Sequence, residues 1–332
     1  MEPAIDGVVS LTLPNGRLNR EAIGWATAPI IDTSGLGRGW GRNKRWEYWN
    51  IATPEYLIGL TVSHIDYACV HEVWVYERAS GSQWHRTATV FPARGGMLAP
   101  TLEQGRSMAR SKNLAIDIDE VRGGTRLRAE IPQVSLDVVV ALPEGHERLA
   151  LVVPWSDTRF QYTVKDIARP ACGELRLDGA THAIGGEAGE AWAVLDHGRG
   201  RWPYDIDWNW GAGSGRSNGR VIGLQLGAKW TAGTGVSENA VFVDGRMHKI
   251  HGETRWEYEL EQWRAPWRVS GGGLEATFEP FYNKRTRTDL LVLKGHTDQC
   301  FGVWSGSFRT VDGERIDFDG LIGWAEEVHN RW

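Results

Sequence analysis

Two hydrophobic runs, LIGLTV at residues 57–62 and EVWVY at 72–76, predict the fold of this chain. Both are rich in β-branched and aromatic residues, and turn-forming residues surround them, which is typical of neighbouring antiparallel strands. Similar runs return in the second half as VIGLQL at 221–226 and AVFVD at 240–244. We therefore expect two copies of one β-rich module.

The repeat extends upstream of both pairs of runs. GRGWGRNKRWEYWN at 37–50 precedes the first pair, and GRGRWPYDIDWNW at 198–210 precedes the second. We predict a first β module at residues 1–165 and a second at 166–332, which ends in a closing strand or hairpin. The boundary falls in TVKDIARPACG, residues 163–173, which contains a proline and a glycine.

The rest of the chain also favours strands. Short β-rich runs are separated by Gly, Pro, Asp and Asn, and Asn-Gly or Asp-Gly pairs mark tight turns at 15–16, 178–179, 244–245 and 312–313. The best helix candidate is TLEQGRSMARSKN at 101–113. The predicted fold class is all-β, with two tandem antiparallel barrels or strongly curved sheets and few short helices.

Composition limits the functional classes. The 332 residues are 41% hydrophobic and 24% charged, with a net charge of −5, which indicates a globular chain without a general attraction for nucleic acid. No secretory signal and no apolar run of about 18 residues is present, so we expect no membrane span. Three widely spaced cysteines, Cys69, Cys172 and Cys300, suggest reduced thiols in a cytoplasmic protein. The 18 tryptophans favour an aromatic-lined interior.

The densest chemistry lies between Asp196 and Trp210, in DHGRGRWPYDIDWNW. Strand alternation would put Trp208 and Trp210 on one face and Asp207 on the other, the face that it shares with Asp205. The two aspartates could serve as a general acid and base, or they could form the solvated side of a strand. Further ligand-binding candidates in this segment are Arg199 as an anchor, or alternatively part of a structural bend, and Trp202 and Tyr204.

The corresponding first-half segment would place Trp46 and Tyr48 on one face and Glu47 on the other. A buried Glu47 would be a useful acid, and the alternative is a rim glutamate paired with a neighbouring cation. His64 lies two residues from Asp66 and could be oriented by it, although a structural histidine explains it equally well.

FQYTVKD at 160–166 supplies two more candidate ligand-binding groups, Tyr162 and Lys165. His248 and His251 lack a third ligand, so the sequence predicts no metal and no cofactor. The motifs of serine hydrolases, zinc peptidases and dithiol oxidoreductases are also missing.

A resemblance to a known family adds to these expectations. FQYTVKD at 160–166, LDHGRGRWPYDIDWNWGAG at 195–213, IGLQLG at 222–227 and GWAEEVHNRW at 323–332 resemble the family called domain of unknown function 2804. That family is similar in layout to tandem lipocalin-like proteins, the group that contains carotenoid hydratases. The resemblance implies acid-catalysed hydration, isomerisation or cyclisation of a hydrophobic isoprenoid- or lipid-like ligand.

The sequence therefore predicts a small-molecule site between or inside two β modules. Its candidate acids and bases are Asp205, Asp207, Glu47 and His64. Two alternatives stay open: a carbohydrate-active enzyme that uses paired carboxylates and tryptophan stacking, and a protein that binds a ligand without reacting with it.

Overall fold

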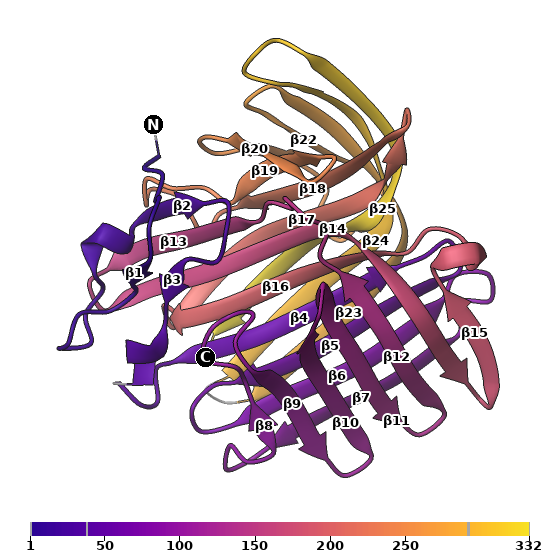
Figure 1. Cartoon of the computed structure of the whole chain (residues 1–332), viewed down its shortest axis with the longest axis horizontal. Helices are drawn as coiled ribbons and strands as arrows, with labels where there is room; N and C mark the ends of the chain where they lie inside the picture. The colour runs from indigo at the N-terminus through magenta and orange to yellow at the C-terminus, as the bar shows by residue number, and fades with distance from the viewer. Residues whose placement is uncertain (1, 38, 291–292, 332) are drawn as a thin grey trace.

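The computed structural model describes residues 2–37, 39–290 and 293–331. The chain forms two large antiparallel sheets, and Figure 1 shows each of them as a strongly curved wall. A parallel pair of short strands, β1 (Val9–Ser10) and β3 (Ile31–Asp32), lies outside both sheets. The only helices in the described residues are three short 3₁₀ turns, η1 (Arg20–Ala22), η2 (Ser34–Gly37) and η3 (Gly186–Ala188).

The first sheet holds the strands of the N-terminal part of the chain. They are β2 (Gly24–Ala26), β4 (Lys44–Ala52), β5 (Tyr56–His64), β6 (Cys69–Glu77), β7 (Gln83–Val90), β8 (Gly96–Met97), β9 (Arg106–Ser111), β10 (Leu114–Val121), β11 (Gly124–Ile131), β12 (Val134–Ala141), β13 (Leu149–Ser156), β14 (Arg159–Leu177), β15 (Ala180–Ile184) and β16 (Trp192–Arg201). The predicted module boundary between residues 165 and 166 lies inside β14, and the first sheet continues to Arg201.

The second sheet holds the rest of the chain. Its strands are β17 (Asp205–Ser217), β18 (Arg220–Ala228), β19 (Asn239–Val243), β20 (Arg246–Ile250), β21 (Arg255–Glu257), β22 (Trp267–Gly271), β23 (Leu274–Leu290), β24 (Leu293–Arg309) and β25 (Arg315–Arg331).

The main paths of the two sheets have similar strand orders. In the first, the order β7-β6-β5-β4-β16-β14-β12-β11-β10 brings the last strand back beside β4. In the second, β20-β19-β18-β17-β25-β24-β23-β22-β21 brings β25 back beside β17. The IGL runs of the repeat therefore occupy β5 and β18, the second strand of each meander. This confirms the predicted all-β class and is consistent with tandem lipocalin-like modules.

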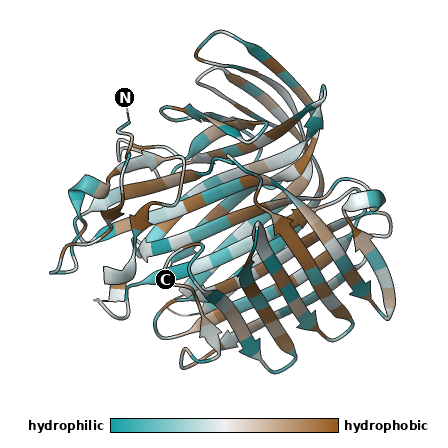
Figure 2. Cartoon of the chain, viewed as in Figure 1, coloured by the Kyte–Doolittle hydropathy of each residue, from teal (hydrophilic) through white to brown (hydrophobic). Residues whose placement is uncertain are grey.

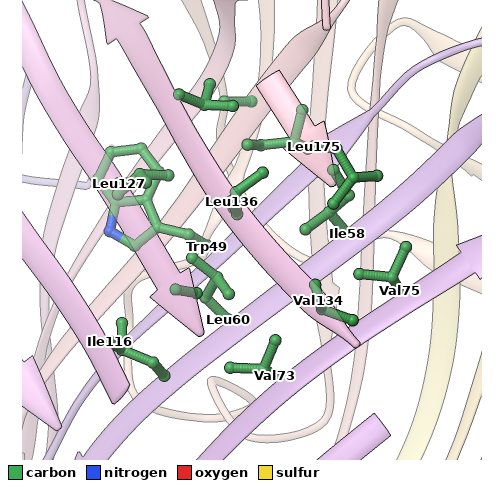
Figure 3. Close-up of a cluster of buried hydrophobic side chains, with 14 of the residues drawn as sticks. Trp49, Ile58, Leu60, Val73, Val75, Ile116, Leu127, Val134, Leu136 and Leu175 are labelled. Carbon is green, nitrogen blue, oxygen red and sulfur yellow. The ribbon is translucent and has the colours of Figure 1, made fainter. Parts of the chain in front are cut away.

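Side-chain alternation explains why these strands form curved sheets. Along β10 to β12, residues such as Ile116, Leu127 and Leu136 point into a core shared with Ile58 and Val73 (Figure 3). Polar residues alternate with them (Figure 2), and ion pairs on the opposite face join Arg128 to Asp119 at 2.7 Å and Arg110 to Asp117 at 2.7 Å. Burial of one face and charge on the other fix the register.

The turn predictions are confirmed at two hairpins. Asp178 and Gly179 have φ angles of 50° and 89°, and Asp244 and Gly245 have 50° and 81°. These consecutive positive angles are those that a two-residue type I′ turn requires.

The helix predicted at 101–113 is wrong. Residues 106–111 form β9, which pairs with β10. Ser107 and Ala109 alternate inward along it, so the segment completes a sheet and buries its apolar positions at a period of two. In the described part of the chain, no helix has the length and apolar character to cross a membrane. The cytoplasmic location stays a prediction.

Candidate active site between the two sheets

A cavity of about 370 Å³ lies between the facing sheets. Strands β4, β5, β6, β14 and β16 line it from the first sheet, and β17, β23, β24 and β25 line it from the second. Because side chains alternate along a strand, β4 contributes Trp46 and Tyr48, and β17 contributes Trp208 and Trp210. The predicted faces of these four aromatic residues are thus correct, and all four face one space.

A row of polar side chains crosses the first sheet at the floor of this cavity. Lys165, Asp196, Tyr48, Thr61 and Glu72 are consecutive cross-strand partners on β14, β16, β4, β5 and β6. All five line the cavity. Residues opposite each other in register lie on one face of a sheet, so the pairing itself assembles the row.

A matching row crosses the second sheet. Trp210, Glu326, Gln299 and Lys284 are cross-strand partners on β17, β25, β24 and β23. The two rows meet where Lys284 Nζ lies 2.8 Å from Glu72 Oε2 and where Gln299 Nε2 donates to Tyr48 Oη at 3.4 Å.

Behind both rows, the sheets close on an apolar core. Its buried members come from both sheets and include Trp74, Val194, Ala212, Phe301 and Trp324. The charged rows therefore lie between a packed core and the open part of the cavity.

Asp196 is a buried carboxyl group of the site with three polar partners. It accepts hydrogen bonds from the Trp46 indole at 2.9 Å and from the Thr163 hydroxyl at 2.9 Å, and Lys165 Nζ lies 3.0 Å away. Asp196 and Lys165 thus form a buried ion pair.

Glu238 extends this ion pair toward the second sheet. Its side chain packs over Gly227, where no Cβ obstructs it, and its Oε2 lies 3.4 Å from Lys165 Nζ. The Trp230 indole and the Gln225 amide also donate to it. Burial raises the pKa of Glu238 despite Lys165 and the Trp230 hydrogen bond. Lys165 therefore forms ion pairs with two buried residues, Asp196 and Glu238.

Glu326 has a different environment. It is 5% exposed, and the Trp208 indole donates to its Oε1 at 3.0 Å. Among the ion pairs of residues 2–37, 39–290 and 293–331, none includes Glu326. Burial raises the pKa of Glu326 to about 7, and the Trp208 hydrogen bond and the charge of Lys165 offset this only in part. Its carboxyl group can therefore hold a proton near neutral pH.

Aromatic rings form the walls. The Trp202 ring stacks on Trp230 with centroids 5.3 Å apart and meets Trp46 and Trp208 edge to face, each at 5.6 Å. Lys165 Nζ lies 4.3 Å from the Trp210 ring centroid. Gly198 lies beside Trp46, and a Cβ at this position would overlap the indole. The walls are thus fixed by packing and indole hydrogen bonds, and they already hold one ammonium group against a ring face.

Five of the residues that the sequence singled out line this cavity: Trp46, Lys165, Trp202, Trp208 and Trp210. Three others are buried on the opposite face of the first sheet: Glu47, Tyr162 and Arg199. There, Glu47 accepts hydrogen bonds from Ser107 at 2.8 Å and from Arg199 at 3.1 Å. His64 lies outside the cavity lining, with its Nδ1 2.8 Å from Arg45 and accepting from the Asp66 amide at 3.1 Å.

The paired aspartates lie on the outer face of β17. Asp205 pairs with Arg331 at 2.6 Å, and His329 Nδ1 lies 2.6 Å from Asp207. Tyr204 is 51% exposed. The structure therefore does not bring these three residues to the cavity. The alternation that turns Trp208 and Trp210 inward is the same alternation that turns both aspartates outward.

The carboxyl groups of the cavity were not among the candidates. Asp196 is the first residue of DHGRGRWPYDIDWNW, and Glu326 lies in the C-terminal GWAEEVHNRW motif. Both residues therefore belong to motifs that the sequence analysis had singled out. For a metal, the described residues contain no group of three or more His, Cys, Asp or Glu side chains with suitable placement.

Several solved structures are similar to this chain in fold. Kievitone hydratase from Nectria haematococca has a TM-score of 0.52 and 11% identity, over 88% of this chain and 89% of that protein. A putative AttH from Nitrosomonas europaea has a TM-score of 0.51 and 13% identity, over 86% and 92%. CghA has a TM-score of 0.51 and 12% identity, over 88% of each chain. At these identities the likeness shows the fold alone.

No curated protein matches the chain in sequence. The family model described as Domain of unknown function (DUF2804) matches residues 2–332. Because the match covers nearly the whole chain, this protein belongs to the DUF2804 family.

Proposed function

We propose that this protein catalyses acid-dependent hydration, isomerisation or cyclisation of an unsaturated, largely hydrophobic small molecule, with Glu326 as the proton donor. The observation that carries the proposal is a buried carboxyl group whose pKa is about 7, placed among indole rings in a cavity between two sheets. An efficient general acid has a pKa near the working pH, which burial supplies here. The proposal takes Glu326 in place of Asp205 and Asp207, because those two lie outside the cavity.

The chemistry follows from the groups in the cavity. The Glu326 carboxyl group gives its proton to one carbon of a double bond, and the π electrons form the new C–H bond. The adjacent carbon becomes cationic, and the faces of Trp208 and Trp210 stabilise it. In hydration, water adds to that carbon and returns a proton to the Glu326 carboxylate. In isomerisation, the proton returns from a neighbouring carbon, so that in both cases Glu326 ends as it began.

The structural neighbours support the class of reaction. One of them is described as a hydratase and shares this two-sheet fold. Its low identity transfers no residue to this chain, so the assignment of Glu326 depends on burial, hydrogen bonding and the position in the cavity alone.

The test combines ligand identification with a matched pair of variants. Organic extracts of the purified protein are analysed by mass spectrometry, and the unsaturated compounds found are incubated with the protein in deuterated water. We expect turnover to place one solvent deuterium on carbon, and Glu326→Gln to slow it by about 10²- to 10⁴-fold. The exposed Glu275→Gln on β23 is the control and should retain the rate.

The pH dependence gives a second readout. Because the acid must be protonated, the rate should fall as pH rises through about 7. Turnover by Glu326→Gln at the parental rate, or a rate that rises through this range, would contradict the proposal.

A further inference from the structure

The cavity has two chemically different ends. Indole rings surround Lys165, Asp196 and Glu326 at one end. At the other end, the side chains of Thr61 on β5, Thr286 on β23 and Thr297 on β24 line the space. Thr286 and Thr297 are direct cross-strand partners, so their hydroxyl groups lie side by side on one wall.

These hydroxyl groups are available to a ligand. In the part of the chain that the structure describes, none of the side-chain hydroxyls of Thr61, Thr286 and Thr297 has a protein partner. A threonine hydroxyl both donates and accepts, so a ligand hydroxyl or carbonyl satisfies it. The same strands could have carried valine at no cost to β-sheet formation, since both residue types favour strands.

The charges at the floor are compensated inside the protein. Lys284 pairs with Glu72 at 2.8 Å, and Lys165 pairs with Asp196 at 3.0 Å and Glu238 at 3.4 Å. A ligand carboxylate placed beside them would compete with protein carboxyl groups for the same ammonium groups and would lose its water. The floor therefore disfavours an anionic ligand.

The distance between the two ends follows from the sheet. Thr286 lies on β23 and Glu326 on β25, with β24 between them. Thr286 is in register with Val328, which lies two residues beyond Glu326. Two strand spacings across the sheet and two residues along it separate Thr286 from Glu326 by about 12 Å. A ligand that contacts both side chains must therefore be elongated.

We infer that the substrate is a neutral, flat, unsaturated molecule that carries a hydroxyl or carbonyl group at the end remote from the double bond that receives the proton. The threonine end binds the oxygen function, and the tryptophan end holds the reacting double bond beside Glu326. This inference rests on the proposed function for the identity of the reacting end, and it adds the class of ligand.

Three probes of one shape test the ligand class. Stilbene, para-hydroxystilbene and para-carboxystilbene differ only in the group at one end, and their binding is measured by quenching of tryptophan fluorescence. We expect para-hydroxystilbene to bind about three- to tenfold more tightly than stilbene, as one hydrogen bond to a neutral group allows. We expect para-carboxystilbene to bind most weakly of the three. The inference is overturned if the carboxylate binds most tightly or if none of the three binds.

Substitutions of the threonines test which groups cause the preference for para-hydroxystilbene over stilbene. Thr286→Val together with Thr297→Val keeps the shape of the wall and removes its hydroxyls, so it should equalise stilbene and para-hydroxystilbene while leaving the affinity for stilbene unchanged. Thr286→Ser with Thr297→Ser should retain the preference, and the exposed Thr181→Val on β15 is the distant control. A preference that survives the double valine variant would overturn the inference, as would a double serine variant that loses it.

The binding test of the ligand class can fail or succeed independently of the turnover test of the proposed function. Glu326→Gln should bind the neutral probes with the parental order of affinities, because it leaves the threonine end intact. If Glu326→Gln retains turnover, the proposed function fails, whereas the probe affinities still decide the class of ligand.

Discussion

At the scale of single residues, Glu326 links catalysis to stability. Its pKa is about 7 in the folded protein, against an ordinary value of 4.5, so the folded state keeps the proton to a higher pH than the unfolded chain does. The folded state consequently loses stability as pH rises from about 4.5 to about 7, by about 3 kcal/mol in all. Glu326→Gln removes this pH dependence. As the pH is raised from about 5 to about 8, we expect the free energy of unfolding of the variant, measured by urea denaturation, to increase relative to that of the parent by about 2 to 3 kcal/mol.

The comparison with Glu275→Gln controls for loss of a surface charge. That variant should follow the parent at both pH values, because Glu275 is exposed. A stability difference between parent and Glu326→Gln that stays constant with pH would show that Glu326 titrates normally.

The sequence predicted which aromatic residues share a face, but it could not predict which carboxyl group faces the cavity. Alternation correctly grouped Trp208 with Trp210 and Trp46 with Tyr48, because a period of two is a property of any strand. Which neighbouring carboxyl group faces a cavity depends on the second sheet. Glu326 and Glu327 are adjacent in sequence, yet Glu326 faces Trp208 inside, whereas Glu327 pairs with Lys229, which is partly exposed. No local pattern distinguishes the two.

At the scale of elements, the segment before β1 fastens the first sheet to the second. The Glu2 carboxylate accepts hydrogen bonds from Ser237 Oγ at 2.7 Å and from the Gly252 amide at 2.9 Å, and Lys249 Nζ lies 3.0 Å away. Burial by itself would raise the pKa of Glu2, but these partners lower it overall. Ser237 precedes Glu238, so this contact also supports a carboxyl group of the cavity.

We expect Glu2→Gln to destabilise the protein by about 3 kcal/mol, because Lys249 is left buried without its counter-charge. Urea denaturation measures the loss. The neighbouring Asp6→Asn is the control, since Asp6 is exposed and belongs to the same segment. Equal stability of the two variants would mean that the segment is held by its backbone contacts alone.

Elements differ in how well sequence predicts them. Asp178-Gly179 and Asp244-Gly245 were predictable because the positive φ angles of a tight hairpin favour these residue types in any context. The segment 101–113 was not, because its helix-forming residues have a moderate preference that pairing with β10 overrides. Sheet pairing is a long-range property, and local propensity competes with it poorly.

At the scale of the whole molecule, the two sheets share one core beneath the cavity. Trp74 and Phe301 come from different sheets, and their rings stack with centroids 5.1 Å apart. Both are almost fully buried, as is Trp324 beside them. The side chains between the sheets are as fully buried as those in the core of each sheet. Separation of the sheets would therefore expose a hydrophobic core to water.

We therefore expect the sheets to unfold together. Urea denaturation followed by far-ultraviolet circular dichroism and by tryptophan fluorescence should give coincident transitions. Phe301→Ala should lower the free energy of unfolding by about 3 to 5 kcal/mol and move both transitions equally, because the cavity that it creates belongs to both sheets. Phe91→Ala, at a side chain that is 78% exposed, should leave both unchanged. Two separate transitions in the parent protein would mean that each sheet is stable alone, and a binding site between them would then depend on docking of independent units.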